Sequence, residues 1–188
     1  MPAVAAFERY VEQQLDTLTR LAGALAQAGI EYRVVGGVAV FLHVQQREPL
    51  AARATRDIDL AVDRRDLERI GHAVEPFGFE YRHAAGVDML VDRQQSGARG
   101  AAHLIFVREK VRPDYLEPVP DFSSPTVAAN GILLASVADL VLMKLTSYRL
   151  KDRVHLQDLD SVGLITAEIE SGLPAPLCER LREVRATE

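Results

Sequence analysis

The sequence contains one cysteine, Cys178, and it has neither a long apolar run nor an excess of basic residues. A single cysteine excludes an internal disulfide and a cysteine-rich zinc site, so any metal would be held by oxygen ligands or histidine. A membrane-spanning helix needs roughly 20 apolar residues, and the amphipathic start lacks a basic leader followed by an apolar signal core. These absences predict a cytoplasmic protein without a membrane partner.

The balance of charge excludes one class of nucleic-acid-binding protein. The formal net charge is −5, whereas proteins that coat nucleic acid through overall electrostatics need a basic surface. A local basic patch remains compatible with this charge. The 188 residues, 48% of them hydrophobic, are sufficient for one compact domain with a buried core.

Hydrophobic periodicity predicts alternating helices and strands in the first part of the chain. Asp63 is placed to cap the last of these helices, and Pro76 and Gly78 are placed to close it. The predicted elements are a helix over 7–25, a strand over 32–35, a helix over 38–43, a strand over 57–62 and a helix over 64–74.

The second part of the chain predicts a hairpin, a connector and a helical end. Two β-type runs, 87–91 and 102–107, flank a turn-rich stretch over 94–100. Four prolines in 112–125 indicate an extended connector, after which Ser136 is placed to cap a helix. Helices are predicted over 137–145, 154–162 and 176–184. We therefore expect a core over 1–125 and a helical C-terminal extension over 126–188 that packs on it.

Two carboxylates stand two residues apart on a predicted strand. Asp57 and Asp59 would project from one face of that strand, about 7 Å apart along the backbone. Carboxylate oxygens are ligands that Mg²⁺ and Mn²⁺ prefer. Taken alone, this spacing is more often a solvated strand face than a metal site.

A glycine pair precedes these carboxylates at a strand-to-helix turn. Gly36 and Gly37 leave backbone N–H groups open to a ligand at a helix N-terminus, where anions bind. A glycine pair alone is more often simple turn geometry. Combined with Asp57 and Asp59, it predicts a site that binds both charges of a metal-nucleotide.

The order of these motifs is similar to that of the polymerase-beta-like nucleotidyltransferase superfamily. The resemblance covers residues 30–75 and is closest to small bacterial nucleotidyltransferases of the AbiEii abortive-infection type, in the segments 35–39 and 55–59. It implies an α+β nucleotidyltransferase fold with a mixed sheet flanked by helices. It also implies metal held by Asp57 and Asp59, and a triphosphate held by Gly36, Gly37 and Thr55.

A second block, 143–153, resembles the helical region that follows the core in this group. The resemblance gives Lys144 and Asp158 positions near the nucleotide. On a continuous helix Lys144, Tyr148 and Lys151 would share one face. A solvated basic face is the usual interpretation, and it is kept for Lys151 and Arg153. Lys144 lies where periodicity predicts burial, so it is interpreted as a phosphate-binding or catalytic residue.

The chain departs from the superfamily at the third carboxylate, which is expected on a later strand. The matching segment, 101–105, has His103 at that position. A histidine with a pKa near 6.5 can act as a general base, although a histidine in a strand is more often structural. Asp88, Asp92 and Glu109 are the alternatives, and the sequence does not choose among them.

The resemblance implies Mg²⁺- or Mn²⁺-dependent transfer of a nucleoside monophosphate from a nucleoside triphosphate (NTP) to a hydroxyl. The acceptors in the family are tRNA, proteins and small molecules, and the basic run 149–155 favours an RNA acceptor. A toxin-like role with a cognate antitoxin protein is also implied. The alternative is a catalytically impaired protein that binds nucleotides or a protein partner.

Overall fold

The computed structural model describes residues 2–53, 55, 57–94, 101–128 and 131–187. Its α-helices are α1 (Pro2–Gln27), α2 (Gly36–Arg47), α3 (Leu67–Val74), α4 (Val137–Ser147), α5 (Leu150–Ser161), α6 (Ala167–Ser171) and α7 (Ala175–Arg185). Short 3₁₀ helices are η1 (Pro49–Ala51), η2 (Arg64–Asp66) and η3 (Glu75–Phe77). None of the described helices is long and apolar enough to cross a membrane.

The strands form one mixed sheet in the order β3-β4-β5-β2-β1-β7-β6. Strand β2 pairs antiparallel to β1 and parallel to β5. Their bounds are β1 (Tyr32–Val35), β2 (Ile58–Val62), β3 (Phe79–Ala84), β4 (Val87–Asp92), β5 (Ala101–Phe106), β6 (Thr126–Val127) and β7 (Leu133–Leu134). Because helices flank this mixed sheet and further helices follow it, the predicted α+β fold class is confirmed.

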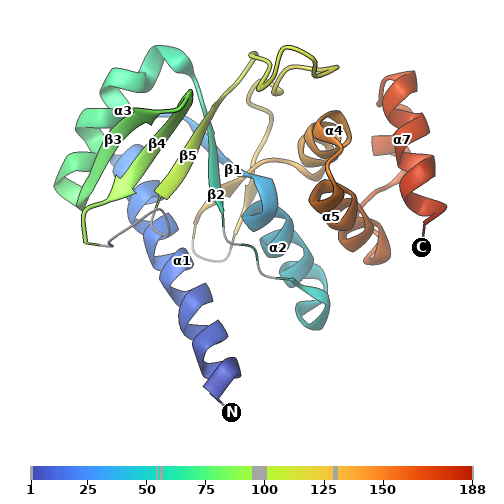
Figure 1. Ribbon diagram of the computed structural model, residues 1–188, viewed down its shortest axis with the longest axis horizontal. Helices are drawn as coiled ribbons and strands as arrows, with labels where there is room; N and C mark the ends of the chain where they lie inside the picture. The colour runs from blue at the N-terminus through green and yellow to red at the C-terminus, as the bar shows by residue number, and fades with distance from the viewer. Residues whose placement is uncertain (1, 54, 56, 95–100, 129–130, 188) are drawn as a thin grey trace.

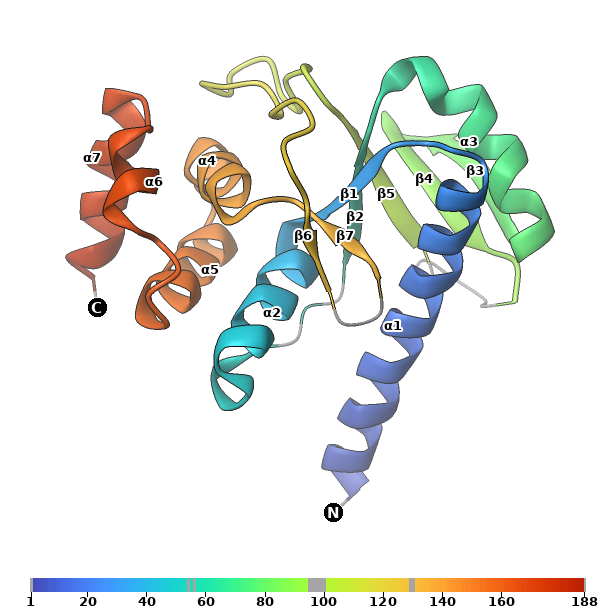
Figure 2. The same cartoon turned by 180° about the vertical axis from the view of Figure 1, so that it is seen from behind.

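The two faces of the sheet are covered differently (Figures 1 and 2). Helices α1 and α3 lie on one face, where alternate residues of β2 such as Leu60 and Val62 are fully buried. Helix α2 lies on the other side of the sheet with α4 and α5, and α7 is outermost (Figure 2). On this second side, residues of β2, β5, α4 and α5 line the cavity described below.

Most elements predicted from periodicity are present. Asp63 accepts a hydrogen bond from the backbone N–H of Arg65 at the start of η2, and Ser136 caps α4 through Asp139 N–H. Gly78 closes η3 with a φ of 87°. Strands β4 and β5 pair antiparallel as the predicted hairpin requires, although residues 95–100 of its turn lie outside the described residues.

Three strands were not predicted, and neither were the short helices η1 and α6. Strand β3 is an edge strand with three exposed residues at its end, so it has little hydrophobic alternation. Strands β6 and β7 are only two residues long, and Leu134 of β7 pairs with Val34 of β1. The division of the chain at residue 125 stays a prediction, and β6 and β7, just beyond it, belong to the sheet.

Candidate active site

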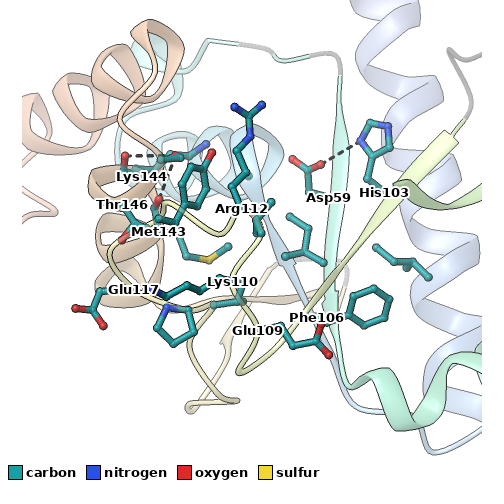
Figure 3. Close-up of a pocket in the computed structure, with 18 of the residues that line it drawn as sticks. Asp59, His103, Phe106, Glu109, Lys110, Arg112, Glu117, Met143, Lys144 and Thr146 are labelled. Atoms are coloured by element: carbon teal, nitrogen blue, oxygen red, sulfur yellow. Dashed lines mark hydrogen bonds and ion pairs between the residues drawn. The ribbon is translucent and has the colours of Figure 1, made fainter. Parts of the chain in front are cut away.

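A cavity of about 500 Å³ opens between the sheet, the connector after β5, and helices α4 and α5 (Figure 3). On the sheet side the cavity is lined by Asp59 of β2, by Asp57 just before that strand, and by His103 of β5. Helices α4 and α5 contribute cations, and the connector contributes both cations and acids. The residues used below are Asp57, Asp59, His103, Arg112, Lys144 and Lys151. Gly36, at the first turn of α2, also lines the cavity.

Gly36 allows the carboxylate of Asp59 to lie against the N-terminus of α2. Its φ of 71° is in the left-handed region that favours glycine. A Cβ atom added there would lie 2.1 Å from Oδ2 of Asp59, which is an impossible contact. No side chain caps this helix N-terminus within the described residues, so its backbone N–H groups are available to an anion.

Gly37 has a comparable relation to Thr55. A Cβ atom on Gly37 would lie 2.6 Å from Oγ1 of Thr55, so the two predicted phosphate-binding residues are neighbours. Thr55 packs behind the helix start and does not line the cavity. Ala54 and Arg56, on either side of it, lie outside the described residues.

His103 stands directly beside Asp59. The parallel pairing of β2 and β5 places the two residues in register, and Nδ1 of His103 is 3.2 Å from Oδ1 of Asp59. This hydrogen bond raises the pKa of His103 above its ordinary value, against the opposite effect of partial burial. The strand position at which the resemblance predicts a third carboxylate therefore carries an imidazole that bonds to Asp59.

The alternative acids on β4 point to the other face of the sheet. Met89 is the residue of β4 paired with His103, so its neighbour Asp88 projects to the opposite face. There Asp88 accepts hydrogen bonds from Tyr81 and His83 at 2.6 and 2.8 Å. Asp92 lies two pleats further, on the same face as Asp88, and pairs with Arg20.

Glu109 lies beyond the end of β5, where it makes a two-pronged ion pair with Arg64 at 2.6 and 2.7 Å. The charge and hydrogen bonds of Arg64 hold the pKa of Glu109 below its usual value. The described residues contain no group of three or more His, Cys, Asp or Glu side chains that could hold a metal ion. Asp88 and Glu109 also line the cavity, but each is bonded to other side chains, and His103 is the residue that bonds to Asp59.

Asp57 has a different cationic neighbour. Nζ of Lys151, in the first turn of α5, lies 3.3 Å from Oδ2 of Asp57, and about half of each side chain is exposed. Such an exposed ion pair is weak. Lys151, which sequence reasoning assigned to a solvated helix face, therefore reaches the predicted metal ligand.

Lys144 is buried, as its periodicity predicted, and its ammonium is bonded to Asp152 at 3.0 Å. Asp152 is fully buried and also accepts hydrogen bonds from Ser147 and Arg149. Burial alone would raise the pKa of Asp152, but Arg149 and the charge of Lys144 outweigh that effect and hold it well below the usual value. Lys144 is thus on the cavity wall as part of a satisfied internal network.

The expectation that Lys144, Tyr148 and Lys151 share one helix is wrong. Tyr148 has a φ of 50° and ends α4, and α5 begins at Leu150. The side chain of Asp152 reaches back to the backbone N–H of Arg149 at 3.2 Å and so starts the new helix. No glycine or proline marks this break, which is why periodicity did not reveal it.

Asp158 lies on α5, two turns beyond Lys151, and does not line the cavity. Burial raises its pKa, and Arg53, whose Nε is 3.1 Å from Oδ1, opposes that shift. The basic side chains of the run 149–155 are largely engaged with other residues of the chain. Arg149 bonds to Asp152, Arg153 stacks 4.3 Å over the ring of Tyr148, and burial lowers the pKa of His155 to about 4.

Two residues of the cavity wall, and the buried Asp152 behind it, had little signal in the sequence. Their residue types are common on protein surfaces, and their positions in the sequence form no recognisable motif; they are Lys151, Arg112 and Asp152. Asp152 lies three positions after Arg149, which is the spacing between the first and last residues of a capping box. This spacing could have located the start of α5. The position of Arg112 in the cavity follows only from the fold of the connector.

No protein-family model matches the chain, and no curated protein matches it in sequence. Among solved structures it is similar to an antigenic nucleotidyltransferase-like protein from Paracoccidioides brasiliensis. That pair has a TM-score of 0.57 and 17% sequence identity over 91% of this chain and 86% of the other. It is also similar to the antibiotic-resistance factor ANT(2'')-Ia, with a TM-score of 0.51 and 13% identity over 93% and 83% of the two chains. The chain therefore has the nucleotidyltransferase fold.

Proposed function

We propose that this chain is a Mg²⁺- or Mn²⁺-dependent enzyme that transfers a nucleoside monophosphate from an NTP to a hydroxyl group. The observation that carries the proposal is the position of Asp59. Its carboxylate lies between the uncapped N-terminus of α2 at Gly36 and the imidazole of His103, on one side of a single cavity. An anion-binding helix start and a metal-binding carboxylate so close together fit a metal-nucleotide.

Asp57 and Asp59 are the residues that would hold the metal. Both residues offer carboxylate oxygens, which suit a divalent metal ion. Asp57 lies next to the cationic Lys151, and Asp59 lies next to the protonatable His103. Positive charge is thus already favoured at both carboxylates. A bound divalent ion would neutralise phosphate charge and polarise the transferred phosphoryl group.

The chain's own groups would then position the reactants. The backbone N–H groups at Gly36 and Gly37 bind phosphate oxygens, and Lys151 lies beside the same site. The acceptor oxygen attacks the α-phosphorus, the bond from that phosphorus to the bridging oxygen breaks, and pyrophosphate leaves. With Nδ1–H of His103 donating to Asp59, Nε2 can accept the proton of the attacking hydroxyl.

A small hydroxyl-bearing molecule is the acceptor that the observations favour. A cavity of about 500 Å³ is the size of a small-molecule site, and the antibiotic-resistance factor with this fold supports the same class. The run 149–155 gives little support for tRNA or another RNA, because most of its charges are paired or buried. A toxin-like role of the AbiEii type with an antitoxin partner gains no support from the comparisons.

Labelled NTPs incubated with Mg²⁺ or Mn²⁺ and mixtures of small molecules, tRNA and proteins would test the proposal. We expect one acceptor class to be labelled, and Asp59→Asn and Asp57→Asn to reduce transfer by roughly 1,000-fold or more, equivalent to about 4 kcal/mol of barrier. Asp16→Asn, in an exposed ion pair on α1, is the matched control and should transfer normally. Absence of transfer with all four NTPs and both metals would contradict the proposal.

A second candidate is a nucleotide-binding protein with impaired catalysis. The observation that favours it is His103 at the strand position where a third carboxylate was expected. The transfer assay distinguishes the two candidates, because the second predicts no labelled product with any acceptor. Calorimetry should still detect Mg²⁺-NTP binding by the wild-type chain.

A further inference from the structure

The connector between β5 and β6 is fixed at its base and carries charged residues over the cavity. The backbone N–H of Arg108 donates to the carbonyl of Val119 at 2.8 Å, and Val119 N–H donates to Glu109 at 2.9 Å. The side chain of Arg108 also bonds to Asp63 and Asp121 on either side of this base. Residues 109–119 therefore form a closed loop on a rigid support.

The cations of the cavity wall fall into two groups. Those on the helices and on η2 each have a carboxylate partner, as described above for Lys144, Lys151 and Arg64. Lys110 and Arg112 of the loop are exposed and have no hydrogen bond or ion pair from their side chains to any described residue. They are the cavity's charges that a ligand can bind without breaking an existing pair.

Arg112 lines the same cavity as the carboxylate site. Figure 3 shows its side chain extending between Asp59 on β2 and Lys144 on α4. Glu117 is an acid of the same loop that also lines the cavity, and in this view it lies on the side away from Asp59. Pro113 restricts the backbone of Arg112 to extended conformations, which lowers the entropy lost when the side chain binds.

We propose that Arg112 binds the polyphosphate of the nucleotide, with Lys110 adding charge, so that the loop 109–119 forms the phosphate-binding wall opposite the N-terminus of α2. This inference rests on the proposed function and names a binding residue for it. A planar guanidinium with free N–H groups can bind two phosphate oxygens at once, which a single ammonium cannot do with the same geometry. The phosphates would then lie between Arg112 and the backbone N–H groups at Gly36.

Isothermal titration calorimetry can test this role. Wild type and Arg112→Gln would be titrated with Mg²⁺ and the α,β-methylene analogues of the four NTPs, with inorganic tripolyphosphate, and with the four nucleoside monophosphates. We expect Arg112→Gln to weaken binding of triphosphate and tripolyphosphate about tenfold or more, and monophosphate binding much less. Arg112→Lys should recover part of the loss. Arg47→Gln, an exposed arginine in the last turn of α2, is the matched control and should bind as wild type does.

The melting temperature of Arg112→Gln should equal that of wild type, because the side chain has no described partner to lose. Unchanged triphosphate binding by Arg112→Gln would overturn the inference, and so would a variant that only raises the KM for the acceptor. These results would leave the proposed transfer activity intact. A wild-type chain that binds no triphosphate analogue would instead contradict the proposed function, and this inference with it.

Discussion

The cavity has two charged walls that differ in burial and in pairing. On the sheet wall, Asp59 and His103 are partly exposed and make one hydrogen bond to each other at 3.2 Å. On the helical wall, Lys144 is buried and bonds to Asp152 behind it, and Asp152 is bound by three side chains. One wall has ionic groups with free lone pairs, and the other has ionic groups that satisfy each other.

This difference indicates that one wall can bind a ligand and that the other stabilises the fold. A partly solvated carboxylate can exchange a neighbouring cation for a metal or ligand at small expense, because exposed pairs contribute little stability. A fully buried carboxylate cannot lose its partners without leaving an uncompensated charge. We therefore assign ligand binding to the sheet wall and its loop, and assign to the helical wall the fixing of α4 against α5.

The largest effect should come from the helical wall. Asp152→Ala leaves the ammonium of Lys144 buried without its carboxylate, so we expect the free energy of unfolding to fall by about 3–5 kcal/mol. Lys151→Gln, which breaks the exposed pair with Asp57, is the control, with an expected change below about 0.5 kcal/mol. Denaturant unfolding measures both. Equal losses in the two variants would contradict the distinction between the walls.

Gly36→Ala tests the sheet wall, with an intermediate effect. An L-residue in the left-handed region costs roughly 1–2 kcal/mol, and here its Cβ would also displace the carboxylate of Asp59. Gly29→Ala is the matched control, because Gly29 has a similar φ of 62° and no atom within 4 Å of the added Cβ. We expect greater destabilisation for Gly36→Ala by about 1 kcal/mol or more, with loss of Mg²⁺-NTP binding only in this variant. If the two variants lost the same free energy of unfolding and bound Mg²⁺-NTP equally, the close contact between Gly36 and Asp59 would be refuted.

The smallest expected effect is a change of protonation at His103. NMR titration of the metal-free protein should give His103 a pKa above its ordinary value of about 6.5. In Asp59→Asn the charged hydrogen bond is removed while burial remains, so the pKa of His103 should fall. His155, with a pKa of about 4 caused by burial, is the internal reference and should not respond. A pKa of His103 that is the same in both proteins would show that Asp59 is not its partner.

Local patterns were sufficient where the local chain itself decides the structure. The apolar spacing before Gln27, the cap at Ser136 and the left-handed stop at Gly78 each depend on residues only a few positions apart. The hydrogen bond that the backbone N–H of Arg149 donates to the carboxylate of Asp152 is also local, but it competes with continuation of α4. Only packing against the rest of the protein decided that competition, so the break at Tyr148 could not be predicted from helical periodicity.

The sequence alone determined that Gly36 and Gly37 precede two carboxylates on a buried strand, because glycine conformation and strand alternation are local properties. It also determined most of the order of helices and strands that gives the α+β fold, although not β3, β6 and β7. The tertiary structure decided which groups meet. Pairing of β2 with β5 places His103 beside Asp59. The break between α4 and α5 allows Lys144 to bond to Asp152 and Lys151 to bond to Asp57. The closed base of the connector places Arg112 in the cavity wall. These contacts join residues far apart in the chain or depend on a helix break, so their partners are fixed by packing.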